Sequence, residues 1–443
     1  MQSKQQLNLF SLVMIVVGLV IGMGIFRTAA TSAKGAIEPS VYFTAWIIGG
    51  FIAICGALTF AEIGSRMPVI GGYYKVFSYA YHPSVAFGVN CIIIISNAAG
   101  VAGVAIIGSG YITKIFPQHL WTDIDKAIIS SLAIITFYCI NLMGLKTSSL
   151  AQNILMLIKI AMVMMLAGCL FSTSNYEVQT HNTVTQPVNT LNWIQSLGVS
   201  LIAVTFTCSG YEHTINFGGE IKKAAKNIPR GIFIGISIVI TLYLLVSLSY
   251  YLIIGFENIK TENEIAYVLI NKVFGQTIAK VFSFFLFVGV LAYVNTLLMS
   301  NPRIMFAMGQ DGSLPKIFAK QHHKTQVQTI ALTVFAAICI IILFYAQTFD
   351  KILNFSIFLD CFGMVASSAS VFILRKRTRH LNNTGIYQMK YKILTVLFII
   401  AYLFVGISIT IQTPDLALIG LCVLIGFIII YFLFSEKKKS IKL

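Results

Sequence analysis

Apolar stretches long enough to cross a membrane recur along almost the whole chain. The sequence has 443 residues, of which 57% are hydrophobic and only 10% are charged. A helix needs about 20 apolar residues to cross a bilayer, and in lipid only helices and closed barrels satisfy their own backbone hydrogen bonds. We therefore expect an all-α integral membrane protein with about twelve transmembrane helices. The expected spans are residues 10–33, 41–64, 84–113, 126–145, 151–173, 192–217, 231–254, 277–308, 328–346, 352–374, 391–411 and 416–434.

The basic residues are distributed in a way that sets an orientation in the membrane. The formal net charge is +16, but the 31 Lys and Arg cluster in alternate loops rather than on one soluble face. This is the positive-inside pattern, so it indicates lipid surroundings and no nucleic acid partner. We expect a multi-pass protein of the cell's inner (cytoplasmic) membrane with both termini cytoplasmic. The largest expected cytoplasmic groups are Lys222, Lys223, Lys226 and Arg230; Arg375, Lys376, Arg377 and Arg379; and Lys437, Lys438, Lys439 and Lys442.

The sequence contains little that would serve an enzyme or a metal. All eight cysteines lie in expected spans and lack metal-ligand spacing. There is no paired carboxylate, His-rich cluster or nucleophile elbow at membrane depth. We therefore predict no catalytic residues, no cofactor and no metal. The first apolar segment has no small-residue cleavage site, so it is interpreted as a retained span.

Two of the expected helices are interrupted in their middle. The first break covers residues 21–26 (IGMGIF), and the second covers residues 207–210 (TCSG). Glycine weakens a helix by about 1 kcal/mol relative to alanine, and backbone groups freed inside lipid need protein or a cavity to satisfy them. Paired breaks are typical of carriers that hold their substrate at the bilayer midplane. The two breaks are therefore the predicted binding site.

The chain is expected to form a single transmembrane domain, residues 1–443, with an internal repeat. Residues 10–173 would form a first set of five spans and residues 192–374 a second set, each beginning with a broken helix. Because five is odd, the second set enters the membrane from the opposite side, and the repeats are inverted. Residues 391–434 would add two helices, which we expect to face lipid or another copy of the chain.

Four segments resemble motifs of one permease family. Residues 22–26 read GMGIF where that family has GSGIF, and residues 61–74 contain AEI, MP and GGYY in the family's order. Residues 206–230 and 302–315 match two further motifs, which end in NIPR and DGSLP. The chain is identified on these motifs as a member of the amino acid, polyamine and organocation (APC) family, and it resembles bacterial relatives of the L-type amino acid transporters. The resemblance implies a LeuT-like fold with a 5+5 inverted repeat and broken helices 1 and 6.

The resemblance also implies how a zwitterionic amino acid would bind. Backbone amides at the first break would meet the carboxylate, as a half-helix N-terminus favours, and carbonyls of both breaks would accept from the ammonium. The amides are those of Gly22, Met23, Gly24 and Ile25; the carbonyls are those of Ile21, Phe206, Thr207, Cys208 and Ser209, with Gly210 completing the second break. Met23 replaces the family's serine and removes a hydroxyl donor. Alternatively, the glycines only permit close helix packing.

Four further residues are candidates for the site. Phe206 matches an aromatic that closes over the substrate in the family, although such residues often only pack. Asn97 and Asn295 are polar groups at membrane depth, where they either line a site or hold helices together. Asp360 would recognise a cationic substrate group, carry a proton or cap a local helix irregularity.

Lys159 is the one basic residue expected within the membrane, since apolar residues surround it on both sides. In sodium-independent relatives a lysine on the fifth span occupies the place of a sodium ion, and Lys159 matches that position. It would then act as a fixed cation that braces the first helix, or as a group whose protonation changes during transport.

These features predict sodium-independent transport of amino acids by alternating access, either by exchange or coupled to protons. The alternatives are an amino acid sensor or a channel that does not accumulate substrate. Met23 and Cys208 favour a small or apolar substrate side chain, whereas Asp360 favours a basic one. Residues 114–125 contain no cysteine, so by resemblance we predict no disulfide-linked heavy chain.

Overall fold

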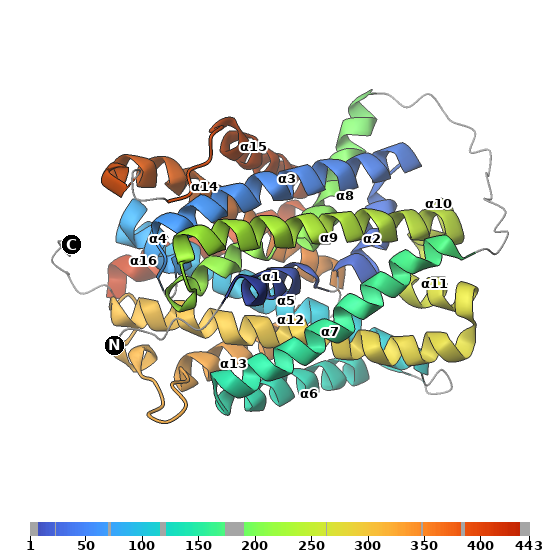
Figure 1. The fold of residues 1–443 in the computed structure, drawn as a ribbon, viewed down its shortest axis with the longest axis horizontal. Coiled ribbons are helices and arrows are strands. Elements are labelled where there is room, and N and C mark those ends of the chain that lie inside the picture. Colours follow the sequence, from blue (N-terminus) through green and yellow to red (C-terminus); the bar gives the residue numbers. More distant parts are fainter. Residues whose placement is uncertain are drawn as a thin grey trace.

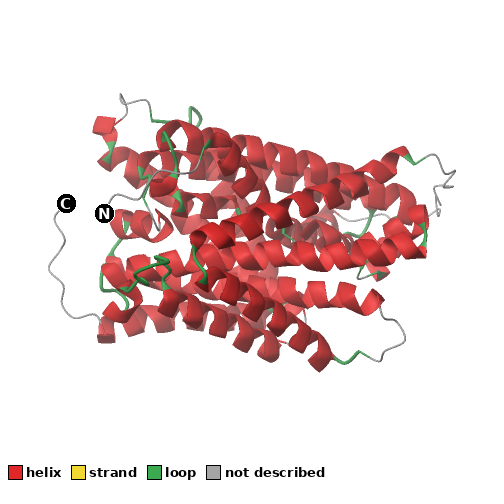
Figure 2. Ribbon diagram, turned by 60° about the horizontal axis from the view of Figure 1, so that its bottom comes forward, coloured by secondary structure: helices red, strands yellow, loops and turns green. Residues whose placement is uncertain are grey.

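The computed structural model describes residues 8–22, 24–69, 72–115, 121–172, 190–262, 264–346, 349–381 and 386–434, and every regular element in these ranges is helical (Figures 1 and 2). Most of the helices run along the long axis of the molecule. They are α1 (Leu9–Val20), α2 (Gly24–Gly35), α3 (Pro39–Arg66), α4 (Gly72–Ala80), α5 (Pro83–Ile115), α6 (Asp123–Leu142), α7 (Leu145–Gly168), α8 (Thr190–Cys208), α9 (Ala224–Ile254), α10 (Phe256–Thr261), α11 (Ile265–Phe274), α12 (Gln276–Gln310), α13 (Thr329–Ala346), α14 (Phe349–Arg377), α15 (Ile393–Gln412) and α16 (Pro414–Phe434). Short 3-10 turns are η1 (Cys169–Phe171), η2 (Tyr211–Asn216), η3 (Gly218–Glu220), η4 (Lys316–Ala319) and η5 (Arg379–Leu381).

The all-α membrane fold expected from the sequence is confirmed. Ten helical segments in the described part of the chain are long and apolar enough to cross a membrane. The other two expected spans, 126–145 and 328–346, fall on α6, which begins with two acidic residues, and on the shorter α13. Both pack against α5 and α12, so they complete the bundle.

Both expected helix breaks are present. The first separates α1 from α2, and the second separates α8 from the 3-10 turn η2 (Figure 1). α2 packs along α8 and α1 packs along α9, so each half of the first broken helix lies against a helix near the second break. Gly210 has φ of 111°, and a Cβ atom built there would lie only 2.9 Å from the carbonyl carbon of Leu19. The two breaks therefore touch each other in the interior of the bundle.

The expectation for residues 391–434 is corrected in part. α16 exposes large apolar side chains along its length, such as Leu418 and Leu433, as expected for a helix that faces lipid. α15, however, packs against α3, α8 and α14, and buries Phe398, Tyr402 and Val405. One face of α15 therefore belongs to the protein core.

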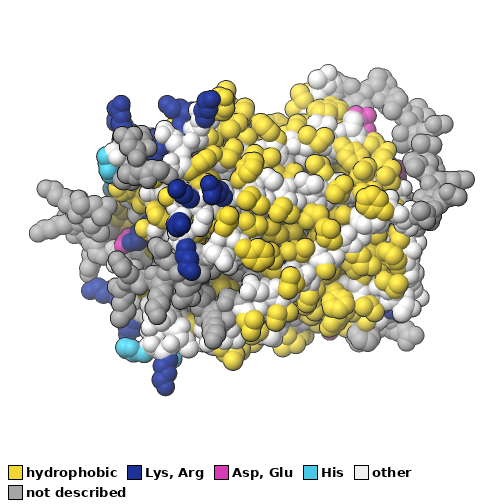
Figure 3. Space-filling model, viewed as in Figure 1, with side chains coloured by type: hydrophobic (Ala, Val, Ile, Leu, Met, Phe, Trp, Pro, Cys, Tyr) yellow, Lys and Arg dark blue, Asp and Glu magenta, His cyan; other side chains and the backbone are white. Residues whose placement is uncertain are grey.

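The surface matches a protein that spans a membrane. Figure 3 shows hydrophobic side chains over the middle of the molecule and Lys and Arg gathered at one end, on the left of the view. α9 begins at that end, next to the basic residues 222–230, and α14 ends there at Arg377. The basic residues are therefore concentrated at one end of the bundle, and the positive-inside rule predicts that this end is cytoplasmic. The basic tail, residues 437–442, lies outside the described residues.

A buried ion pair network lies at the basic end of the bundle. Glu62 of α3 is fully buried, and its carboxylate accepts hydrogen bonds from Arg66 Nε (2.9 Å) and from Arg375 Nε and Nη2 of α14 (2.8 and 2.6 Å). It also accepts from the backbone amide of Met389 (2.9 Å), so one carboxylate joins α3, α14 and the segment before α15.

Replacement of Glu62 by glutamine is expected to destabilise the protein by about 3–5 kcal/mol, because two guanidinium groups would stay buried without their counter-charge. Thermal unfolding of the purified protein in detergent measures this effect. The matched control is Glu257→Gln, which removes an exposed pair with Lys260 (3.1 Å) and should change stability by less than about 1 kcal/mol. Equal melting temperatures for the two variants would contradict the structural role of Glu62.

Candidate functional site

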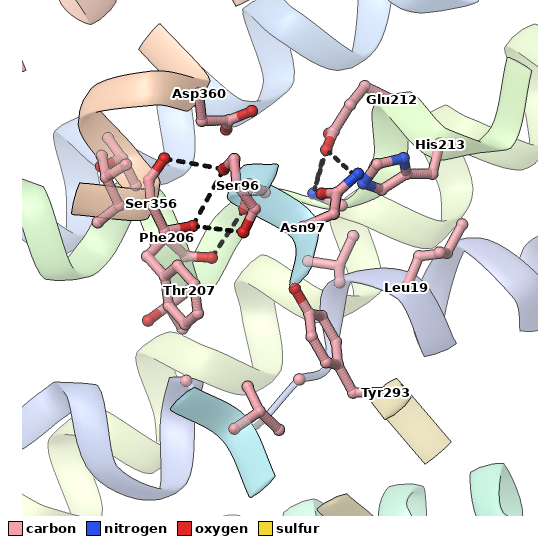
Figure 4. Close-up of a pocket in the computed structure, with 18 of the residues that line it drawn as sticks. Leu19, Ser96, Asn97, Phe206, Thr207, Glu212, His213, Tyr293, Ser356 and Asp360 are labelled. Atoms are coloured by element: carbon pink, nitrogen blue, oxygen red, sulfur yellow. Dashed lines mark hydrogen bonds and ion pairs between the residues drawn. The ribbon is translucent and has the colours of Figure 1, made fainter. Parts of the chain in front are cut away.

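A cavity of about 30 Å³ lies where the two breaks meet. Residues from seven helices and η2 surround it, and Figure 4 shows their side chains converging on it. The lining residues are Leu19, Val20, Gly22, Gly24, Ser96, Asn97, Val104, Thr205, Phe206, Thr207, Ser209, Gly210, Glu212, His213, Tyr293, Ser356, Ile357, Asp360 and Tyr402. A single water needs roughly 10–15 Å³ by this measure, so a larger guest requires lining side chains such as Phe206 and Tyr293 to move.

The carbonyl end of the first break is held by protein groups. α1 ends at Val20, whose carbonyl accepts from the Tyr243 hydroxyl of α9 (2.9 Å) and from the amide of Gly22 (2.7 Å). The carbonyl of Ile21 accepts from the ammonium of Lys159, which is fully buried on α7. A cation is stabilised at a helix C-terminus by the dipole of that helix. Lys159 therefore contacts the carbonyl end of α1, the place in which both sequence interpretations put it, and its role stays a prediction.

The amide end of the first break faces the cavity. α2 begins at Gly24, and the first amides of a helix have no partner within it. Gly22 and Gly24 both line the cavity, while Ile25 does not and Met23 lies outside the described residues. A Cβ at Gly22 would stand 3.4 Å from the Tyr293 ring, an ordinary contact, so the missing side chain leaves space there.

Gly24 differs from Gly22 because it also permits close helix packing. A Cβ atom built at Gly24 would lie 2.8 Å from the Cα atom of Thr207 on α8. The carbonyl of Gly24 accepts from the Thr28 hydroxyl (2.5 Å), and the hydroxyls of Thr28 and Thr207 are in contact. Gly24 thus matches the packing interpretation, whereas for Gly22, which lines the cavity, the binding interpretation stays a prediction.

Backbone groups at the second break are satisfied by side chains of the same segment. The amide of Gly210 donates to both carboxylate oxygens of Glu212 (3.1 and 2.9 Å), and the Ser209 hydroxyl donates to the carbonyl of Phe206 (2.9 Å). Four of the five residues predicted here line the cavity: Phe206, Thr207, Ser209 and Gly210. Cys208 is buried but is not among the lining residues.

The two asparagines, which looked alike in the sequence, have different surroundings. Asn97 of α5 lines the cavity and donates from Nδ2 to Oδ1 of Asn301 on α12 (2.8 Å). Asn295 is not among the lining residues; it donates to Gln152 Oε1 (2.9 Å) and accepts from Asn141 (2.8 Å). Its contacts join α12 to α6 and α7, which matches the alternative of holding helices together.

Asp360 lies on α14, and its carboxylate points into the cavity beside Ser96 (Figure 4). Within the described part of the chain, no hydrogen bond or ion pair to this carboxylate is formed. One turn earlier on the same helix, Ser356 exchanges hydrogen bonds with Ser96 of α5, each hydroxyl donating to the other residue's carbonyl (2.9 and 2.8 Å).

Eleven lining residues were not among the predicted site residues: Leu19, Val20, Ser96, Val104, Thr205, Glu212, His213, Tyr293, Ser356, Ile357 and Tyr402. The sequence held a signal for two of them, since Ser96 is next to Asn97, and Ser356 precedes Asp360 by one helical turn and so shares its face. Tyr402 had no such signal because it lies on α15, outside the expected repeats.

Comparison with known proteins identifies similar sequences over most of the chain. The model of the amino acid permease family matches residues 7–434. The serine/threonine exchanger SteT of Bacillus subtilis (strain 168) is 25% identical over 384 residues, which cover 85% of this chain and 84% of that protein. The large neutral amino acids transporter small subunit 2 of Homo sapiens is 22% identical over 440 residues, 97% of this chain and 80% of that protein. The branched-chain amino acid permease BcaP of Bacillus subtilis (strain 168) is 25% identical over 393 residues, 84% and 82% of the two chains.

Proposed function

Because the chain belongs to the amino acid permease family, whose LeuT-like fold its two broken helices match, we propose that it is a sodium-independent carrier of amino acids in the inner membrane of the cell. It works by alternating access, either as an exchanger or with protons. The observation that carries this proposal is the cavity between the two touching breaks, lined by the start of the half-helix α2 on one side and by oxygen acceptors on the other. This polarity suits a zwitterion.

The carboxylate of the substrate binds at the start of α2. The amides of Gly24 and Ile25 are its donors, and the positive end of the α2 dipole adds to the attraction. The amide of Gly22 already donates to the carbonyl of Val20 (2.7 Å), and Met23 lies outside the described residues. The ammonium binds to carbonyls of the second break, among residues 206–209. Two of the predicted carbonyls already accept hydrogen bonds, that of Ile21 from Lys159 and that of Phe206 from the Ser209 hydroxyl.

Lys159 supports the absence of sodium coupling. Its ammonium reaches the carbonyl end of α1 from α7 and supplies one positive charge inside the membrane. A metal cation at the same carbonyl would meet this charge at close range, and like charges repel strongly where the dielectric is low. The lysine thus performs the bracing that a sodium ion would otherwise provide.

Uptake of labelled amino acids into proteoliposomes tests the proposal. We expect accumulation when the lumen is preloaded with unlabelled amino acids or when a pH gradient is applied, at the same rate in sodium and in choline buffers.

The variant Gly22→Ala should reduce the apparent affinity for the substrate about tenfold. The added methyl group would fill cavity space beside Tyr293 that the substrate needs, and it would not clash with the protein.

The outcomes separate this function from its alternatives. Binding of label without accumulation would identify a sensor, and equilibration without preloading or a gradient would identify a channel. A steep dependence on sodium would remove the role assigned to Lys159.

A further inference from the structure

Five serine and threonine hydroxyls around the cavity direct their protons away from it. Ser96 and Ser356 donate to each other's backbone carbonyls, and Ser209 donates to the carbonyl of Phe206. Thr205 and Thr207 donate to carbonyls in the preceding turn of α8. A hydroxyl that has used its one proton can only accept further hydrogen bonds. These five side chains therefore present acceptors to whatever occupies the cavity.

The ionisable side chains on the side of the cavity away from α2 also present hydrogen bond acceptors to it. Glu212 and Asp360 reach it from η2 and α14, and Glu212 Oε1 lies 3.5 Å from Nε2 of His213. His213 is only 5% exposed, lines the cavity, and has a buried Nδ1 without a hydrogen bond partner. With its proton on Nε2 toward Glu212, the imidazole offers Nδ1 as one more acceptor.

Among the described residues that line the cavity none is Lys or Arg, and the ammonium of Lys159 is directed to the carbonyl of Ile21 on the first break. Carboxylates at membrane depth are unfavourable unless they are paired. The acceptors thus suit a ligand that supplies hydrogen bond donors and positive charge.

We propose that Asp360, Glu212, His213, Ser96 and Ser356 form an acceptor subsite that binds a positively charged group on the substrate's side chain, so that the carrier takes basic amino acids. This inference rests on the proposed function and names its substrate class. The α-carboxylate lies at α2, and the side-chain cation extends toward α14. The rings of Phe206, Tyr293 and Tyr402 also line the cavity and add cation–π attraction.

Competition against one labelled substrate tests the subsite in the wild-type carrier. Lysine, ornithine and arginine are compared with norleucine and citrulline, which have similar size but no side-chain charge. We expect the basic amino acids to compete at least tenfold better than their neutral analogues. Stronger competition by the neutral analogues would overturn the proposal while leaving amino acid transport intact, and a lack of accumulation of any amino acid would instead contradict the proposed function.

The variant Asp360→Asn separates this role from two others. We expect the preference for basic over neutral amino acids to fall to within about threefold, with uptake of neutral analogues retained. The matched control is Asp123→Asn, at the exposed start of α6, which should keep the wild-type preference. Loss of uptake of all amino acids by folded protein would show that Asp360 holds the α-ammonium, and an altered pH profile with unchanged selectivity would show that it carries a proton; either result would overturn the proposal.

Discussion

The substitution Gly210→Ala is expected to reduce transport by at least about a hundredfold and to lower the stability of the folded protein. Two effects combine at this residue. The backbone of Gly210 has φ of 111°, in a region that disfavours L-residues by about 1–2 kcal/mol. In addition, the new methyl group would meet the backbone of Leu19, only 2.9 Å from its carbonyl carbon, and such overpacking typically costs another 1–3 kcal/mol. Relief of the overlap requires the two breaks to separate, which would disrupt the cavity between them.

A second glycine isolates the contribution of this contact. Gly275, before α12, has φ of 84°, and a Cβ atom built there has no neighbour within 4 Å. Gly275→Ala should therefore show the backbone strain alone, with near-normal transport. Thermal unfolding in detergent and uptake into proteoliposomes provide both readouts. If the two alanine variants behaved alike, the contact between the breaks would have no energetic importance.

The second large effect is expected from Lys159→Met, which keeps much of the side-chain volume and removes the ammonium. The carbonyl of Ile21 would lose its donor from α7, and the end of α1 would lose a positive charge. A hydrogen bond to a charged group contributes about 1.5–3 kcal/mol. Removal of the ammonium also removes the desolvation cost of a buried cation, and this gain offsets part of the lost free energy. We therefore expect the protein to fold and transport to fall by roughly a hundredfold, about 2.7 kcal/mol of activation free energy.

The matched control for Lys159→Met is Lys260→Met. Lys260 lies on α10 and pairs with Glu257 near the surface, so its loss should leave uptake unchanged. Size-exclusion chromatography confirms that each variant is folded before uptake is measured. Wild-type uptake by Lys159→Met would exclude a role for this ammonium in transport.

The sequence by itself determined the features that depend on local composition. Hydropathy over about 20 residues predicted the helices, because burial in lipid demands apolar side chains on nearly every face. Glycines in an apolar run predicted where α1 and α8 end, since their effect is on the local backbone. The depth of Lys159 followed from the apolar residues on both sides of it.

Only the tertiary structure decided which polar groups meet. Asn97 and Asn295 have similar sequence surroundings, yet one lines the cavity and the other joins α12 to α6 and α7. Tyr402 reaches the cavity from α15, a helix that we expected to face lipid or another copy of the chain because it lies outside the repeats. The physical reason is that the rotation and tilt of a membrane helix are set by packing against its neighbours. A uniformly apolar sequence does not specify which face those neighbours cover.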